Sequence, residues 1–140
     1  MNNTKELSKI KIFKEKVENL KLIIVDDEIA ILKSTEKFFK KFFEKVTTVQ
    51  TATDALEILS KHNDYDIIIT DLKMPYMDGT ELINKIKENP NYRDLFIVII
   101  SGTTKDNQKT TNLSDFYIQK PVNLQNIIEM LDKLITKKEL

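Results

Sequence analysis

The sequence predicts an α/β domain in which helices cover both faces of a parallel β-sheet. Continuous apolar stretches at residues 21–25, 66–70 and 96–101 are rich in Ile and Val, which is typical of parallel strands buried on both faces. Segments with helical periodicity separate the strands, and this strict alternation favours a parallel sheet. The 140 residues suit a single hydrophobic core.

The first 19 residues lie outside the alternating pattern. Apolar residues recur there at spacings of three or four, which predicts an amphipathic helix: Leu7, Ile10, Phe13, Val17 and Leu20. This helix fits three arrangements, namely packing on the domain, pairing with a second copy to form a homodimer, or connecting to an upstream segment. We therefore divide the chain into an N-terminal amphipathic extension, residues 1–19, and a domain of residues 20–140.

Five strands and the helices between them follow in order. The strands are predicted at residues 21–25, 46–50, 66–70, 96–101 and 116–119. The second strand alternates and is rich in threonine, which suits the edge of a sheet. Apolar stripes predict helices around residues 31–43, 52–59, 82–86 and 124–135. The polar segment 102–115 predicts a short helix at most, and a plain loop fits it nearly as well.

Composition excludes several classes of function. The chain has 22 basic and 22 acidic residues, so its net charge gives no general reason to bind nucleic acid or an anionic membrane. It has no cysteine, which excludes disulfides, thiolate metal sites and cysteine nucleophiles. The apolar runs are too short to span a bilayer, and the N-terminus is too charged for a secretory signal. We expect a cytoplasmic protein.

The chain contains only two glycines, Gly79 and Gly102. In so glycine-poor a sequence, we expect each to lie where the backbone cannot tolerate a side chain.

Reactive side chains stand at the ends of four predicted strands. Asp26 and Asp27 follow the first strand, Asp71 follows the third, Ser101 ends the fourth and Lys120 follows the fifth. In open α/β sheets, function gathers at the carboxyl ends of the strands. We therefore expect these side chains to share one small cleft.

The chemistry of this cluster indicates phosphoryl transfer. Three crowded carboxylates repel one another unless a cation intervenes, and hard oxygen ligands suit Mg²⁺. Lys120 can neutralise the remaining charge or hold a phosphoryl oxygen, and Ser101 can donate a hydrogen bond to the same group. Asp71 is then the candidate nucleophile.

Each residue met alone has a more ordinary role. Asp26 and Asp27 could cap the first long helix, and Asp71 could form an Asx turn. A Lys-Pro pair at a strand end is ordinarily a stop signal, and Ser101 before a glycine is ordinarily a turn. These roles do not predict that such residues stand in order at successive strand ends.

In this order and spacing the residues resemble the receiver domain of two-component response regulators, over roughly residues 20–137. The resemblance rests on Asp26-Asp27, the sequence DLKMPYMDG from Asp71, Ser101-Gly102 and Lys120-Pro121. It implies a flavodoxin-like fold similar to the chemotaxis receiver, with sheet order 2-1-3-4-5 and five flanking helices. The segment 102–115 is shorter than usual for the family.

The resemblance also implies a function and a set of roles. Asp71 would accept a phosphoryl group from a sensor histidine kinase or phosphotransfer protein, and Lys120 would contact that group. Mg²⁺ would be bound by Asp27, Asp71 and the backbone carbonyl of Lys73, with Asp26 acting largely through water. Ser101 and Tyr117 would form the switch that alters docking to a downstream partner protein. The Lys120–Pro121 bond is expected to be cis.

Such a domain is a signalling module rather than an enzyme, apart from its own phosphorylation and dephosphorylation, and we expect no direct contact with nucleic acid or membrane.

Two alternative functions belong to other classes of protein. One is a pseudo-receiver that binds partners without phosphorylation, although that class usually lacks Asp71 or Lys120. The other is a Mg²⁺-dependent hydrolase with an aspartyl nucleophile. Such hydrolases often carry a second acid two residues after the nucleophile, where this chain has Lys73.

Overall fold

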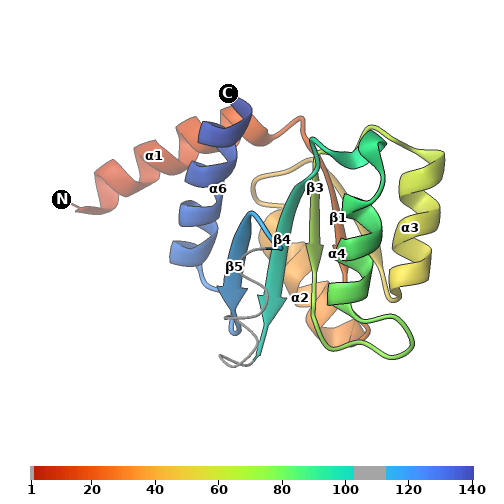
Figure 1. Ribbon diagram of the computed structural model, residues 1–140. Helices are drawn as coiled ribbons and strands as arrows, with labels where there is room; N and C mark the ends of the chain where they lie inside the picture. The colour runs from red at the N-terminus through yellow and green to blue at the C-terminus, as the bar shows by residue number, and fades with distance from the viewer. Residues whose placement is uncertain (1, 103–112) are drawn as a thin grey trace.

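The computed structural model describes residues 2–102 and 113–140, and its centre is a parallel sheet of five strands (Figure 1). The strands lie in the order β2-β1-β3-β4-β5, which confirms the predicted topology. Their bounds are β1 (Lys21–Val25), β2 (Lys45–Val49), β3 (Ile67–Thr70), β4 (Phe96–Ser101) and β5 (Phe116–Gln119).

Two strands begin one residue away from their predicted starts. The register pairs Lys21 with Lys45, so β2 starts and ends one residue earlier than predicted. Asp66 precedes β3, and its carboxylate accepts a hydrogen bond from the Lys21 backbone N–H at 2.8 Å. The predicted edge position of the second strand is confirmed, since β2 pairs with β1 alone among the described strands.

Helices cover both faces of the sheet. On one face, α2 (Ile29–Phe39), α6 (Leu124–Lys138) and α1 (Asn2–Val17) share a hydrophobic cluster with alternate residues of β1, β3 and β4. On the other face lie α3 (Ala52–Lys61) and α4 (Gly79–Lys87), followed by a short 3₁₀ turn, η1 (Pro90–Tyr92). Residues 103–112 lie outside the described part of the chain, and with them most of the segment for which we predicted a short helix or loop.

The N-terminal helix packs on the domain, one of the three arrangements that the sequence allowed. Phe13 is 8% exposed and Val17 is fully buried, and both belong to the cluster that joins α2 and α6. Leu7 and Ile12 remain 66% and 51% exposed. The N-terminal part of α1 thus extends past α6 (Figure 1), and a homodimer through this part of the helix stays a prediction.

The loop between β3 and α4 is fixed by an N-cap and a glycine. The Asp78 carboxylate accepts a hydrogen bond from the Glu81 N–H at 2.9 Å and so caps α4. A Cβ added at Gly79 would lie 2.1 Å from the Asp71 carbonyl oxygen, so only glycine fits there. At Gly102 an added Cβ meets no described atom within 4 Å and φ is not positive, so our expectation of a crowded site is wrong there.

In the described residues, every helix is too short or too polar to cross a membrane.

Candidate functional site

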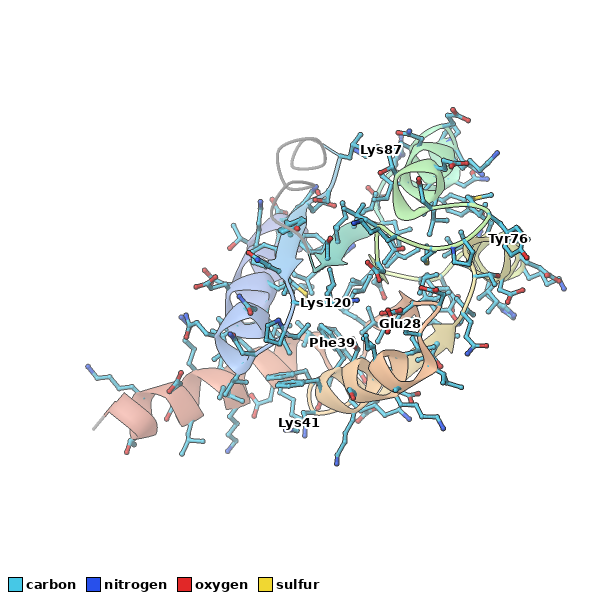
Figure 2. The ribbon with its side chains drawn as sticks, turned by 90° about the horizontal axis from the view of Figure 1, so that it is seen from below. Glu28, Phe39, Lys41, Tyr76, Lys87 and Lys120 are labelled. Atoms are coloured by element: carbon cyan, nitrogen blue, oxygen red, sulfur yellow. The ribbon has the colours of Figure 1, made fainter. Side chains whose placement is uncertain are left out.

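The carboxyl ends of the strands bring three of the predicted site residues into direct contact. The strands point downward in Figure 1, and Figure 2 looks onto this edge from below. The Lys120 Nζ lies 3.0 Å from Asp71 Oδ2 and 3.5 Å from Asp26 Oδ2. Three residues from three separate strand ends, up to 94 positions apart in sequence, therefore form one charged cluster.

Backbone hydrogen bonds hold each of these residues in line with the sheet. The Asp26 N–H donates to the Val49 carbonyl at 3.2 Å, and the Asp71 N–H donates to the Val25 carbonyl at 3.1 Å. The Lys120 N–H donates to the Ser101 carbonyl at 2.8 Å. The hydrogen bonding between strands thus continues one residue past the strand ends, and it fixes the backbone positions of Asp26, Asp71 and Lys120.

The two buried aspartates also make local hydrogen bonds. Asp26 Oδ1 accepts from the Glu28 N–H at 3.0 Å, and Asp71 Oδ1 accepts from the Leu72 N–H at 2.7 Å. Asp26 therefore stabilises the turn before α2, but the N-cap position of that helix is Glu28 and has no side-chain cap. For both residues Oδ2 faces Lys120, so the ordinary local role and a role in the cluster coexist.

Burial and charge shape the protonation of this cluster. Burial raises the pKa of Asp26 above its ordinary value, against the lowering effects of the Glu28 N–H and of Lys120, and the nearby Asp71 charge adds to the rise. Burial alone would lower the pKa of Lys120. Its hydrogen bond and charge attraction to Asp71, together with Asp26, outweigh that effect, and the pKa of Lys120 is raised. Lys120 is therefore a protonated cation at neutral pH.

Asp26, Asp27 and Asp71 together meet the requirement for a cation site. One carboxylate oxygen from each lies within 4.8 Å of the others, with Asp26 and Asp71 buried and Asp27 the most exposed. Among the described residues, Lys120 is the one cation within 4 Å of Asp26 and Asp71, so the cluster holds more carboxylates than paired ammonium groups. All-oxygen donors with an open side suit a hard divalent ion that keeps part of its water shell.

The predicted switch residues lie on neighbouring strands. Ser101 is buried at the end of β4, where it pairs with Gln119, and Tyr117 pairs with Ile99. Because side chains alternate along a strand, Ser101 and Tyr117 face the same side of the sheet. Tyr117 is half-buried against the cluster of α3 and α4. Their roles as a switch stay a prediction.

Two further expectations concern the backbone. The Lys120–Pro121 peptide bond is cis, as predicted. Lys73 is exposed, and the role of its carbonyl in binding a metal stays a prediction.

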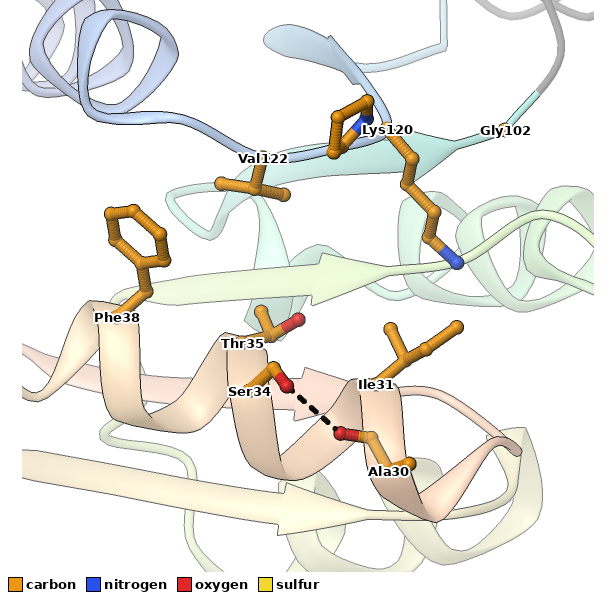
Figure 3. A pocket seen from close by; sticks show the side chains of 9 residues that line it. Ala30, Ile31, Ser34, Thr35, Phe38, Gly102, Lys120 and Val122 are labelled. Atoms are coloured by element: carbon orange, nitrogen blue, oxygen red, sulfur yellow. Dashed lines mark hydrogen bonds between the residues drawn. The ribbon is translucent and has the colours of Figure 1, made fainter.

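Sequence reasoning missed a groove beside the cluster (Figure 3). It has a volume of about 560 Å³, and its walls come from α2 and from the segment after β5. Thr35 is 8% exposed, and its hydroxyl points into the groove without a hydrogen bond to any other described residue. The signal in the sequence is a threonine within the otherwise apolar stripe that predicted the helix around residues 31–43. The lining residues are Ala30, Ile31, Ser34, Thr35, Phe38, Gly102, Lys120, Pro121 and Val122.

Comparison with known proteins places the chain in a family. Residues 22–132 match the response regulator receiver domain. The two-component response regulator ARR16 of Arabidopsis thaliana is 34% identical over 126 residues, covering 79% of this chain and 77% of ARR16. A response regulator receiver domain protein from Clostridium thermocellum has a crystal structure that superposes with a TM-score of 0.75 at 26% identity, covering 86% of this chain and 98% of that one.

Other relatives are much longer than this chain. The response regulator ARR11 of Arabidopsis thaliana is 29% identical over 120 residues, which cover 85% of this chain but 23% of ARR11. The family match at residues 22–132 includes Asp26, Asp71 and Lys120, which stand at the strand ends of the α/β domain. The chain belongs to the response regulator receiver domain family of two-component signalling.

Proposed function

We propose that the chain is a phosphoacceptor of a two-component phosphorelay, modified on Asp71 by a histidine kinase or a phosphotransfer protein. The observation that carries the proposal is the 3.0 Å contact between Lys120 Nζ and Asp71 Oδ2 at the carboxyl edge of the sheet. This contact places a protonated lysine next to the position where a phosphoryl group on Asp71 would carry its negative charge. Family membership supports the same role.

The reaction at Asp71 is a displacement at phosphorus. A carboxylate oxygen of Asp71 forms the new O–P bond while the N–P bond of a phosphohistidine breaks, and the histidine nitrogen keeps the electron pair and takes up a proton. Asp71 becomes an acyl phosphate. Lys120 shifts its contact toward the phosphoryl oxygens, and the Leu72 N–H holds the carboxyl group in one orientation through its 2.7 Å hydrogen bond.

Asp26, Asp27 and Asp71 would hold Mg²⁺ in this reaction, with the Lys73 carbonyl as a further ligand. The ion would supply positive charge to the phosphoryl oxygens. In support, one carboxylate oxygen from each lies within 4.8 Å of the others, and in the described part of the chain only Lys120 forms an ion pair with Asp26 and Asp71.

The groove beside Lys120 is the surface over which we propose that the phosphodonor protein docks. Asp71 is only 8% exposed, so a donor must approach closely at the edge of the sheet. The groove borders that edge, its walls are largely apolar, and the Thr35 hydroxyl offers one polar group for a donor side chain. The cellular place of such a relay is the cytoplasm, and the downstream partner is a further protein.

Intact mass after incubation with Mg²⁺ and acetyl phosphate tests the function directly. We expect the wild-type chain to gain the mass of one phosphoryl group and Asp71→Asn to gain none, because the amide is not a nucleophile for phosphorus. Asp54→Asn, on the exposed face of α3, is the matched control and should behave as wild type. An unmodified wild-type chain would favour the pseudo-receiver alternative, and phosphorylation that persists in Asp71→Asn would contradict the assignment of the acceptor.

Thermal unfolding in increasing Mg²⁺ tests the cation site separately. Binding to the native state alone adds RT ln(1 + [L]/Kd) to the free energy of unfolding, about 2.7 kcal/mol at one hundred times Kd. We expect the melting temperature of the wild type to rise with Mg²⁺, and that of Asp27→Asn to rise far less. An equal rise in both proteins would indicate nonspecific binding of the cation. The melting temperature measured in a chelator of divalent cations, without added Mg²⁺, is the baseline for both proteins.

A further inference from the structure

Tyr76, in the loop that follows Asp71, is unusual in both its exposure and its backbone conformation. Its side chain is 100% exposed, more than any other large apolar or aromatic residue in the described part of the chain. Its backbone has φ = 67°, in the left-handed region. A bulky side chain rarely adopts this conformation, because its Cβ then crowds the backbone. The native fold thus tolerates a strained backbone while it leaves an aromatic ring in water.

Neither feature serves the stability of the domain. Met74 and Met77, on either side of Tyr76, are half-buried against the cluster of α3 and α4 and anchor the loop. The loop is also held at its ends, by the Leu72 N–H on Asp71 and by the cap of Asp78 on α4. Glycine or asparagine at position 76 would adopt the same backbone at lower cost. Backbone strain that the fold does not need is a reason to look for function.

The position of the ring indicates what it contacts. Tyr76 lies five residues after Asp71, and Figure 2 shows it at the rim of the carboxyl edge, on the side opposite Lys120. Asp71 is only 8% exposed, so a protein that reaches it must approach closely at this edge. Rigid, exposed aromatic side chains are the residues that most often anchor such contacts, since they bury a large area at little conformational cost.

We propose that Tyr76 is a docking contact for the protein that delivers the phosphoryl group to Asp71, and that its ring packs against an apolar part of that donor. This inference rests on the proposed function. It adds a second contact, at the rim of the carboxyl edge, to the groove of α2.

The test compares two phosphodonors on the same variants. One is acetyl phosphate, and the other is the purified phosphorylated histidine phosphotransfer protein that transfers fastest to the wild-type chain from a panel. For Tyr76→Asn we expect an unchanged rate with acetyl phosphate, transfer from the protein about tenfold slower, and a higher melting temperature. Tyr76→Phe should keep both rates, because it keeps the ring. Ile12→Asn, which removes an exposed apolar side chain on α1, should also keep both.

Three results would overturn the proposal. Transfer from the protein donor to Tyr76→Asn at the wild-type rate would show that the ring makes no useful contact. An equal slowing with both donors would mean that Tyr76 shapes the Asp71 site instead. Equal slowing in Tyr76→Asn and Ile12→Asn would indicate a general effect of lost apolar surface. If the wild-type chain accepts no phosphoryl group even from acetyl phosphate, the proposed function fails, which is a separate result.

Discussion

Phe13→Ala is expected to lower the free energy of unfolding by about 3 kcal/mol, at the lower end for buried Phe-to-Ala changes. Phe13 is 8% exposed and packs into the cluster shared by α2 and α6, although it lies in a helix outside the alternating strand–helix pattern. Its removal leaves a cavity in the cluster where α1 packs on α6. Urea unfolding followed by circular dichroism measures the change.

Ile12→Ala is the matched control for Phe13→Ala, because it shortens the neighbouring side chain on the same helix. Ile12 is 51% exposed, so its change should lie within about 0.5 kcal/mol. A small and equal effect of both substitutions would contradict the packing of α1 on the domain. Deletion of residues 1–19 should be more damaging than Phe13→Ala, since it also removes the fully buried Val17. If the helix served only to pair two copies, the deletion would change the sedimentation profile and leave the unfolding of the domain intact.

The sequence was enough to predict the sheet and the cluster because both depend on strong local signals. The runs at β1, β3 and β4 are apolar on both faces, which only a covered parallel sheet accommodates. Once parallel strands are assigned, their carboxyl ends must share an edge, so that residues as distant as Asp26 and Lys120 come together. The contact at 3.5 Å between these two is thus a consequence of topology.

Other features depend on packing between distant segments and could not be predicted. The stripe of α1 was visible, but its docking on α6, in a cluster that α2 shares, depends on the shape of a surface that no local pattern describes. Thr35 stands within an apolar helical stripe, and the sequence did not indicate that its side chain lines a groove. The left-handed backbone of Tyr76 was equally hidden, because a tyrosine gives no local signal for it.

The two glycines lie in different surroundings, one crowded and one open. Gly102 has ordinary φ and open space around its missing Cβ, so the shortage of glycine in the chain did not by itself identify a crowded position. Gly79 is crowded because the start of α4 lies against the backbone that follows β3, and its N–H donates to the Leu72 carbonyl at 2.9 Å. The expectation of a crowded backbone is confirmed at Gly79, although the sequence did not show that Asp71 and Leu72 cause the crowding.

Gly79→Ala is therefore expected to destabilise the domain by about 3 kcal/mol or more, at or above the usual cost of overpacking. The new Cβ would lie 2.1 Å from the Asp71 carbonyl oxygen and 2.9 Å from the Leu72 Cα, and no side-chain rotation can relieve a clash with backbone atoms. The start of α4 or the residues after β3 must move instead. Because Asp71 carries one of these atoms, we also expect slower phosphorylation by acetyl phosphate in the fraction that remains folded.

Gly102→Ala separates this steric effect from the general effect of replacing glycine. Its Cβ meets no described atom within 4 Å, and alanine restricts the unfolded chain, so the free energy of unfolding should stay the same or rise by up to about 1 kcal/mol. A large loss of stability for Gly79→Ala and none for Gly102→Ala, both measured by urea unfolding, is the expected result. If Gly79→Ala lost no stability, α4 could not begin as close to Asp71 as the structure places it. The acceptor loop would then be held by the hydrogen bond between Leu72 and Asp71, by the Asp78 cap and by the two methionines.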